Sequence, residues 1–286
     1  ATLLERVEVA DLLRDGQRVT GVRMEGTTPG EIKAPIVIGA DGAYSVVARA
    51  LGMEQLDEAH YCAGLRAYYE GVTGFHPLNN VELHFVEEAI PGYFWIFPMA
   101  NGRANVGVGL LSRVVKKKGI RLRALLDELV AHPRFRERFA SARRVSPVRG
   151  WGLPLGSRVR PLAGDGWMLA GDAASLIDPF TGEGIGNAMV SGECAARWAE
   201  AAHESGRFEG SVLADYEREL RTYLSSELRL SHTMQRLLNW KWLVNAIIRK
   251  ASRSEELAGA ISGMFDSEEE RQKLVSPLFY LKALVR

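Results

Sequence analysis

GDAASLIDPFTGEGIGNAM, residues 171–189, is the stretch that decides the fold. The apolar run Trp167–Ala170 before it is typical of a buried strand, and the chain becomes helical from Gly184. The Asp172 carboxylate at the strand end can accept two hydrogen bonds from a ribose or ribityl chain. Gly182 and Gly184 let a ligand approach the backbone, and the helix start favours an anion. The pattern predicts a nucleotide cofactor site, and an ordinary strand–loop–helix connection is the alternative.

This stretch resembles the second FAD-binding motif of the p-hydroxybenzoate hydroxylase-type flavoproteins. Its extension GEGI at 182–185 is similar to one branch of them, the geranylgeranyl reductase family. The resemblance implies that Asp172 binds the ribityl part of FAD and that Pro179–Ile185 lies against the flavin ring and pyrophosphate. The cofactor-binding residues implied here are Gly171, Asp172, Pro179, Gly182, Glu183, Gly184 and Ile185.

A second match is GADGAYS at residues 39–45, which resembles the Asp-Gly motif of the same superfamily. It adds Asp41 and Gly42 to the implied cofactor-binding residues. Asp41 stands where the short apolar strand 36–38 gives way to a predicted helix, a favourable place for a carboxylate to meet backbone N–H groups. An ordinary helix N-cap is the alternative interpretation.

A third match is PGYFWIFP at residues 91–98, with Gly107-Val108-Gly109 downstream. It resembles the Tyr-x-Trp-x-Phe-Pro substrate-site signature of geranylgeranyl reductases. Side chains alternate along a strand, so Tyr93, Trp95 and Phe97 share one face. Three aromatic rings on one face form an apolar wall suited to an isoprenoid chain. The alternative is the core face of a sheet.

The remaining pattern predicts an α/β (α+β) fold: a Rossmann-like FAD-binding domain, incomplete here, an inserted antiparallel-sheet substrate domain and a helical C-terminal region. The predicted FAD-binding part is 1–58 and 145–204, the substrate-binding part 59–144, and the C-terminal helical part 205–286. Asp15-Gly16 is a hairpin signal, and His132-Pro133 should end a helix. We expect a Pro/Gly-rich connection from Pro147 to Gly166.

The glycine-rich motif Gly-x-Gly-x-x-Gly, which opens the family's FAD domain, follows no strand in this sequence. The simplest expectation is an N-terminally truncated copy of the family, and the alternative is a descendant that works without the cofactor. A truncated chain should expose apolar surface and purify without stoichiometric flavin.

The composition excludes several classes of protein. Apolar residues make up 47% and charged residues 25% of the 286 residues, which are ordinary globular values. The net charge of +1 gives no reason to expect a nucleic-acid partner. Cys62 and Cys194 build no disulfide framework, and we expect no metal site and a cytoplasmic location.

The resemblance implies an enzyme, an oxidoreductase that uses FAD to reduce carbon–carbon double bonds in an isoprenoid chain, with NAD(P)H or another electron donor reducing the flavin. N5 of the flavin would deliver a hydride, and Tyr44, Tyr93 and His84 are candidate proton donors. A flavin-dependent monooxygenase or halogenase is one alternative, because such enzymes share Asp41-Gly42 and Gly171-Asp172. A non-enzymatic prenyl- or lipid-binding fragment is the other.

The segment 237–248, LLNWKWLVNAII, is strongly apolar and flanked by Arg236, Arg249 and Lys250. It is too short to span a bilayer. Two tryptophans with basic flanks suit a helix in the membrane interface, whereas a buried core helix is the alternative. The predicted isoprenoid substrate leads us to expect peripheral membrane contact.

Overall fold

The computed structural model describes residues 2–26, 28–53, 56–254 and 259. The chain divides into two compact units, called unit 1 and unit 2 below. Unit 1 comprises Ala1–Leu56, Pro154–Met234 and Ala246–Arg286, and unit 2 comprises Asp57–Leu153 and Gln235–Asn245. The assignment of FAD binding and substrate binding to separate parts of the chain stays a prediction.

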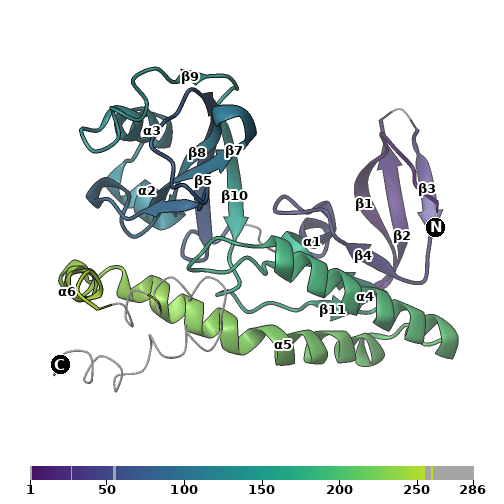
Figure 1. Ribbon diagram of the computed structural model, residues 1–286. Coiled ribbons are helices and arrows are strands. Elements are labelled where there is room, and N and C mark those ends of the chain that lie inside the picture. The colour runs from purple at the N-terminus through teal and green to yellow at the C-terminus, as the bar shows by residue number, and fades with distance from the viewer. Residues whose placement is uncertain (1, 27, 54–55, 255–258, 260–286) are drawn as a thin grey trace. The chain divides into compact units, whose positions relative to one another are not determined.

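Unit 1 combines two small sheets with long helices (Figure 1). Its elements are β1 (Glu8–Asp15), β2 (Arg18–Glu25), β3 (Gly30–Lys33), β4 (Val37–Gly39), α1 (Val46–Ala50), β11 (Ala163–Gly164), β12 (Trp167–Leu169), the 3-10 helix η3 (Gly171–Ala174), α4 (Ile185–Ser205) and α5 (Gly210–Leu237). The expected hairpin is confirmed, since β1 and β2 pair antiparallel and close at Asp15 and Arg18, with Gly16 at φ 58°.

The second sheet of unit 1 positions the candidate site. Its strand order is β11-β12-β4, and β12 runs parallel to β4 with Leu169 opposite Gly39. A side chain at Gly39 would meet Leu169 Cδ2 at 2.7 Å and Val47 Cβ at 2.8 Å, so this glycine lets α1 and β12 pack tightly. The ends of both strands therefore bring two separate loops to one edge of the sheet.

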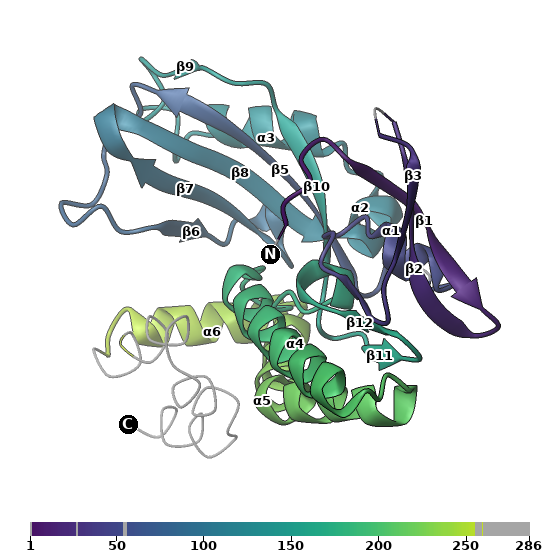
Figure 2. The same cartoon turned by 90° about the vertical axis from the view of Figure 1, so that its right-hand side faces the viewer.

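Helices α4 and α5 lie side by side in unit 1 (Figures 1 and 2). Trp198 Nε1 and Arg197 Nη2 of α4 donate to the Glu219 carboxylate of α5 at 2.7 and 2.5 Å. Buried Tyr216 of α5 donates its hydroxyl to the Leu169 carbonyl at 2.6 Å. This bond ties α5 to the strand that leads into the candidate site.

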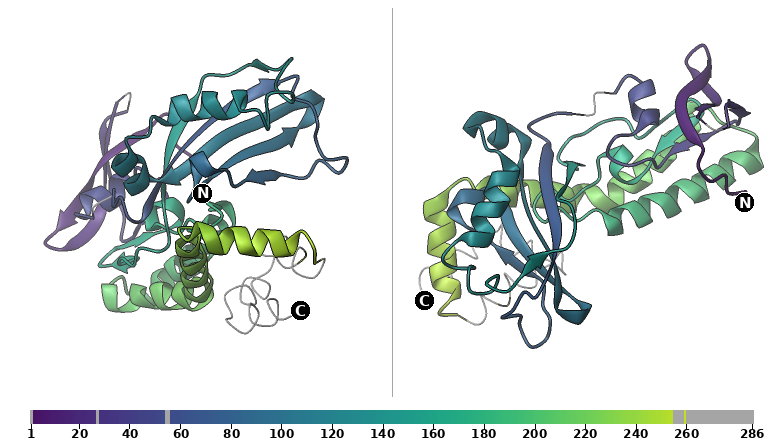
Figure 3. Two further views of the ribbon diagram at one scale, coloured as in Figure 1. Left: turned by 90° about the vertical axis from the view of Figure 1, so that its left-hand side faces the viewer. Right: turned by 90° about the horizontal axis from the view of Figure 1, so that it is seen from above.

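Unit 2 is an antiparallel sheet with one face covered by a helix. The main strand order is β10-β5-β8-β7-β6, and β9 pairs with β5. The elements are β5 (Tyr61–Glu70), β6 (Glu82–His84), η1 (Glu87–Ala89), β7 (Tyr93–Met99), η2 (Ala100–Gly102), β8 (Arg103–Leu111), α2 (Ser112–Lys118), α3 (Leu122–Ala131), β9 (Arg143–Arg144) and β10 (Arg149–Pro154). Helix α3 covers one face of the sheet (Figure 3). Leucines of α3 belong to the hydrophobic core formed with that face.

The Pro/Gly-rich connection from Pro147 to Gly166 contains β10 and the short β11, two strands that the sequence did not reveal. Glycines in β10 suggested a loop, but they make room for side chains of the neighbouring strand. A side chain at Gly152 would lie 2.0 Å from the Tyr61 hydroxyl, and one at Gly150 would lie 2.8 Å from Leu65 Cδ2. The glycines therefore serve close packing inside the sheet.

The C-terminal part is helical as far as it is described. Helix α6 spans Lys241–Ala251, and α3 ends as expected at His132. The part of the predicted helical region 205–286 that follows Ser254 lies outside the described residues, apart from Gly259. No described helix is long and apolar enough to cross a membrane.

Candidate functional site

Two aspartates follow the parallel strands of unit 1. Asp41 comes two residues after β4, and Asp172 comes three residues after β12. Because Gly39 and Leu169 are paired partners, both carboxylates belong to loops that leave the same edge of the sheet. This edge, where parallel strands end, is a favoured place for a ligand in open α/β sheets.

The Asp41 carboxylate is held by the start of α1. It accepts hydrogen bonds from the Ser45 hydroxyl at 2.6 Å and from the Val46 and Val47 amides at 2.7 and 3.2 Å. Ser45 Oγ in turn accepts from the Ala48 amide at 2.9 Å. The expectation that Asp41 meets N–H groups at a helix start is confirmed, and this geometry gives it a capping role. Gly42 follows it at φ 78°.

The Asp172 carboxylate, in contrast, has no hydrogen-bond donor from any residue that the structure describes. It is half-buried, and burial raises its pKa. Gly184 lies beside it, and a side chain there would come within 3.3 Å of Asp172 Oδ1 and 2.9 Å of Ile177 Cγ1. A buried carboxylate without a donor, next to a glycine, fits a ligand that supplies hydroxyl groups, as a ribityl chain does.

The backbone around Asp172 is fixed by contacts with α4. The Gly171 amide donates to Ser191 Oγ at 2.9 Å, and Gly171 itself has φ 59°. A side chain at Gly171 would lie 3.2 Å from Ala188 Cβ, so the loop packs directly on the helix. Asn187 Nδ2 donates to the Leu176 carbonyl at 2.6 Å. Neither Asn187 nor Ser191 is among the cofactor-binding residues that the sequence implied, although both lie on the helix predicted from Gly184 onward.

The loop between η3 and α4 winds around Asp178, which sequence reasoning also missed. Asp178 Oδ1 accepts from the Phe180 amide at 2.9 Å and from the Thr181 amide and hydroxyl at 2.8 and 3.0 Å. Asp178 is 3% exposed, so the turn is built on a buried carboxylate. The Asp-Pro pair is the signal that could have predicted this turn. Buried Pro179 and Gly182, at φ 72°, complete it.

The start of α4 is partly occupied by the chain itself. Glu183 Oε1 accepts from the Gly186 amide at 2.8 Å, which caps the helix. The amides of Ile185 and Asn187 have no acceptor among the described residues and remain available to an anion. The Ile185 side chain is 77% exposed. The start of α4 therefore offers an anion fewer free amides than the sequence suggested, because Glu183 already accepts from the Gly186 amide.

The aromatic signature lies on β7 as predicted. Phe94 and Ile96 are fully buried in the core beneath α3, whereas Tyr93, Trp95 and Phe97 lie half-buried on the opposite face. Ring centroids are 6.0 Å apart for both the Tyr93–Trp95 and the Trp95–Phe97 pair. The three rings thus form a continuous aromatic row outside the core.

Glycines of β8 create the space for this row. Gly109 lies opposite Tyr93 and Gly107 opposite Trp95. A side chain at Gly107 would meet Trp95 Cζ2 at 2.1 Å, so only glycine lets the indole lie flat on the sheet. Trp95 Nε1 donates to Asn105 Oδ1 at 3.1 Å, which fixes the orientation of the ring.

The same face carries two residues that the sequence reasoning did not single out. Arg66 lies opposite Gly107 and Tyr68 opposite Asn105, so both share the face of the aromatic row. The Arg66 guanidinium carbon lies 4.5 Å from the centroid of the Tyr68 ring. The alternation of side chains along β5 could have predicted that Arg66 and Tyr68 share a face. Their place beside the aromatic row depends on the pairing of β5 with β8, which only the tertiary structure shows.

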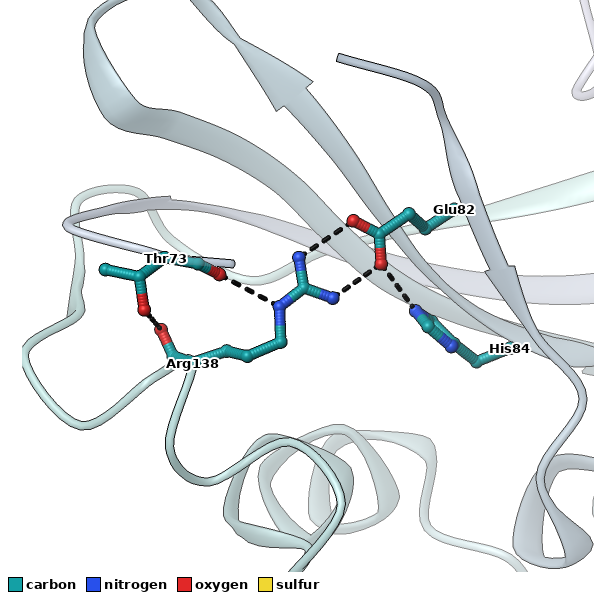
Figure 4. Close-up of polar contacts among 4 residues, drawn as sticks. All are labelled: Thr73, Glu82, His84 and Arg138. Atoms are coloured by element: carbon teal, nitrogen blue, oxygen red, sulfur yellow. Dashed lines mark hydrogen bonds and ion pairs between the residues drawn. The ribbon is translucent and has the colours of Figure 1, made fainter. Parts of the chain in front are cut away.

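His84, a candidate proton donor, belongs to an ion-pair network on the core face of unit 2 (Figure 4). Arg138 holds Glu82 with two hydrogen bonds of 2.5 and 2.8 Å and donates its Nε to the Thr73 carbonyl at 2.9 Å. His84 Nε2 lies 3.1 Å from Glu82 Oε2, and its ring centroid lies 4.7 Å from that of Phe135. The geometry favours a structural role for His84.

Acid should destabilise this network. Burial lowers the pKa of His84, against the opposing effect of Glu82, so folding favours the neutral imidazole. Burial alone would raise the pKa of Glu82, but Arg138 outweighs it and the pKa is lowered. For both groups the unfolded chain binds more protons, so stability is lost as pH falls, first below about 6.5 for His84 and then below about 4.5 for Glu82.

We therefore expect the urea midpoint of the chain to fall between pH 7.5 and pH 5.5, and to fall less in His84→Gln. The same change at His76, an exposed histidine of unit 2, should leave the pH dependence as it is in the parent. An identical pH dependence in the parent and His84→Gln would contradict this prediction.

Burial raises the pKa of Cys62 to about 12, so its thiol stays protonated. A thiol that stays protonated is a poor nucleophile, which favours a structural role for Cys62. The described residues contain no group of three or more His, Cys, Asp or Glu side chains arranged to hold a metal ion.

Similar proteins also point to FAD binding. Residues 1–228 match a sequence family described as FAD binding domain. "Digeranylgeranylglycerophospholipid reductase 1" of Methanopyrus kandleri is 38% identical over 208 residues, which cover 72% of this chain and 54% of that protein. "Menaquinone reductase" of Mycobacterium tuberculosis is 35% identical over 188 residues, covering 65% of this chain and 45% of that protein. The chain thus spans about half the length of these relatives.

Solved structures share the fold. A geranylgeranyl bacteriochlorophyll reductase-like protein from Thermoplasma acidophilum aligns with a TM-score of 0.77 and 23% identity, over 97% of this chain and 68% of that chain. A myxobacterial FAD-dependent halogenase aligns with a TM-score of 0.60 and 24% identity, over 76% of this chain and 51% of that chain. At these identities the likeness shows the fold alone.

Proposed function

Because the chain belongs to the FAD-binding domain family, we propose that it is part of a flavoenzyme that reduces carbon–carbon double bonds in an isoprenoid chain. The observation that carries the cofactor part is the half-buried Asp172 carboxylate, which lacks a donor among the described residues and faces Gly184. The names of the relatives, a digeranylgeranylglycerophospholipid reductase and a menaquinone reductase, support a reductase of prenylated lipids. The electron donor, NAD(P)H or another carrier, is part of the proposal.

The residues of unit 1 would hold the cofactor by complementary contacts. Asp172 would accept hydrogen bonds from ribityl hydroxyls, and the amides of Ile185 and Asn187 would donate to a negatively charged group. Gly182, at φ 72°, and Gly184 would keep side chains out of the way of the ring system. When bound, FAD supplies the hydride chemistry of the reduction.

The aromatic row of unit 2, Tyr93, Trp95 and Phe97, would bind the apolar substrate. An isoprenoid chain has no hydrogen-bonding groups, so a wall of half-buried rings can orient it only by shape and by the removal of water. The Trp95–Asn105 hydrogen bond and the absence of a side chain at Gly107 hold the indole in one orientation. A rigid wall of this kind limits the positions that a flexible chain can adopt.

We expect Trp95→Ala to lower isoprenoid turnover at least tenfold while the rate of flavin reduction by the electron donor stays within about twofold. Removing the ring takes away a contact with the isoprenoid substrate. Truncating a large aromatic side chain at a binding surface weakens the binding free energy by about 2 kcal/mol or more. Stopped-flow absorbance of the flavin separates the two half-reactions. Trp151→Ala, at an exposed tryptophan of β10, is the matched control. Equal loss of both half-reactions would show that Trp95 serves the fold.

Peripheral membrane contact is the last part of the proposal. Trp240 and Trp242 at the start of α6 are 56% and 69% exposed, and Ile248 is 48% exposed. Exposed indoles near the start of α6 and basic Arg249 and Lys250 in its last turn suit the headgroup region of an anionic bilayer. This exposure supports an interfacial α6 over a buried one.

The protein should pellet with anionic liposomes and stay in the supernatant when both Trp240→Glu and Trp242→Glu are introduced. Because both side chains are exposed, the double variant should fold. Trp151→Glu, a third exposed tryptophan changed in the same way, should still pellet. If the parent protein does not bind anionic liposomes, the membrane proposal fails.

A further inference from the structure

Unit 1 contains a cavity of about 430 Å³ between the loop Gly156–Leu162 and one side of α5. The Gly156 amide donates to the Ile177 carbonyl at 2.7 Å, and the Leu162 amide donates to Glu217 Oε2 at 2.8 Å. A side chain at Gly156 would lie 2.7 Å from Leu228 Cδ2, so loop and helix are in close contact. These contacts hold both ends of the loop in place, and with them this wall of the cavity.

Arg160 in this wall is a buried cation without a carboxylate partner among the described residues. Its side chain donates Nη1 to Ser175 Oγ at 2.8 Å and Nη2 to Met53 Sδ at 3.2 Å, and its buried Nε has no hydrogen-bond partner in the part of the chain that the structure describes. The residue is only 7% exposed. A guanidinium in such a place is costly unless an anion compensates it. Burial, and secondarily the charge of Arg158, lowers the pKa of Arg160.

The other charged groups of the cavity add to this imbalance. Arg158, Arg221 and Arg229 also line it, and Glu217 is the one lining carboxylate among the described residues. Arg221 already engages Glu217 at 2.7 Å and donates to the Arg160 carbonyl at 2.7 Å. The formal charge of the described lining is therefore +3, with histidine neutral. A cavity of this charge attracts an anion.

Another part of the lining is apolar. Leu220, Leu224 and Leu228 follow each other at intervals of four residues on α5, so they form one stripe along the helix. Leu162 and Leu176 face the same cavity. Its volume is within the usual range of small-molecule sites, about 300–1,000 Å³. The cavity thus offers cationic groups and an apolar stripe to a single ligand.

We propose that this cavity binds an amphiphile that carries a phosphate group, with the phosphate at Arg160 and Arg229 and the apolar chain along the leucine stripe. Guanidinium groups bind phosphate oxygens through paired, directional N–H donors, which favours phosphate over a diffuse anion. This site consists of unit 1 residues other than those proposed to hold FAD. Its occupation requires neither the flavin nor catalysis, so it can be tested apart from the proposed function.

The test is calorimetric titration of the 286-residue chain with decyl phosphate below its micelle concentration. We expect saturable binding of one molecule per chain, at least tenfold weaker in Arg160→Met and in Arg229→Gln. Arg218→Gln removes an exposed arginine of the same helix outside the cavity and should leave the affinity unchanged. Inorganic phosphate should bind at least tenfold more weakly than decyl phosphate, and decanol should not compete.

The absence of saturable binding overturns the proposal, as does equal affinity of the parent, Arg160→Met and Arg229→Gln. Equal affinity for inorganic phosphate and decyl phosphate overturns the amphiphile and leaves a small-anion site. Arg160→Met removes two hydrogen bonds and risks the fold, but Arg229 is exposed, so Arg229→Gln decides the outcome by itself if Arg160→Met does not fold.

Discussion

Replacing Asp172 by alanine should lower the affinity for FAD at least tenfold and leave the flavin-free protein no less stable than the parent. A hydrogen bond to a charged group contributes about 1.5–3 kcal/mol, and the carboxylate has no donor among the described residues that would share this role. Titration of flavin fluorescence measures the affinity. Asp215→Ala, on α5, is a control that removes an aspartate paired with Arg218 instead.

Measuring the stability of the flavin-free Asp172→Ala protein shows whether Asp172 serves flavin binding or folding. Burial raises the pKa of Asp172, so the folded chain binds a proton more readily than the unfolded chain. Ionisation of this group therefore lowers stability as pH rises above the pKa of the unfolded state, and alanine removes that cost. A stable variant with undiminished flavin affinity would remove Asp172 from the proposed site, whereas a lower melting temperature would indicate a structural role.

Gly184→Val should abolish flavin binding. The backbone there has φ −142° and ψ −10°, outside the left-handed region that favours glycine, so the main effect comes from the space that the side chain fills. The first side-chain carbon would lie 3.3 Å from Asp172 Oδ1, and the two methyl groups would fill the space beside the carboxylate. The same carbon would lie 2.9 Å from Ile177 Cγ1, so Ile177 must shift and a moderate loss of stability is expected.

Gly192→Val is the matched control on the same helix. Apart from its chain neighbours and the backbone of α4, no described atom lies within 4 Å of a side-chain carbon built there, so this variant adds the same β-branched residue to α4 without filling the site. Gly184→Ala should show an intermediate affinity, because it adds one carbon only. Retention of flavin by a folded Gly184→Val protein would show that this loop is purely structural.

Sequence motifs alone determined the family of the protein. The match of residues 1–228 to the FAD binding domain family confirms the assignment made from 39–45, 91–98 and 171–189. These motifs are short, and the chemistry of each is local: a carboxylate after a strand, glycines in a turn, aromatic residues at alternate positions. The face shared by Tyr93, Trp95 and Phe97 follows from strand geometry, and the structure confirms it.

Local sequence also determined several element boundaries, because turn and capping residues act over a few positions. Asp15-Gly16 closes a hairpin, and α3 ends at His132. β10 was missed for the opposite reason. Its glycines are typical of loops, and what makes them strand residues is the packing of Tyr61 and Leu65, which come from β5.

Only the tertiary structure decided which polar groups are satisfied. Asp41 and Asp172 look alike in sequence, because each is an aspartate beside a glycine after an apolar strand. The amides at the start of α1 donate to the Asp41 carboxylate, whereas the Asp172 carboxylate has no donor among the described residues. Arg160 is one of many arginines in the sequence, and its burial results from contacts with Ser175 and Met53. Sequence patterns specify which residues can form strands and caps, whereas the pairing of β4 with β12 and the burial of charge depend on contacts between distant parts of the chain.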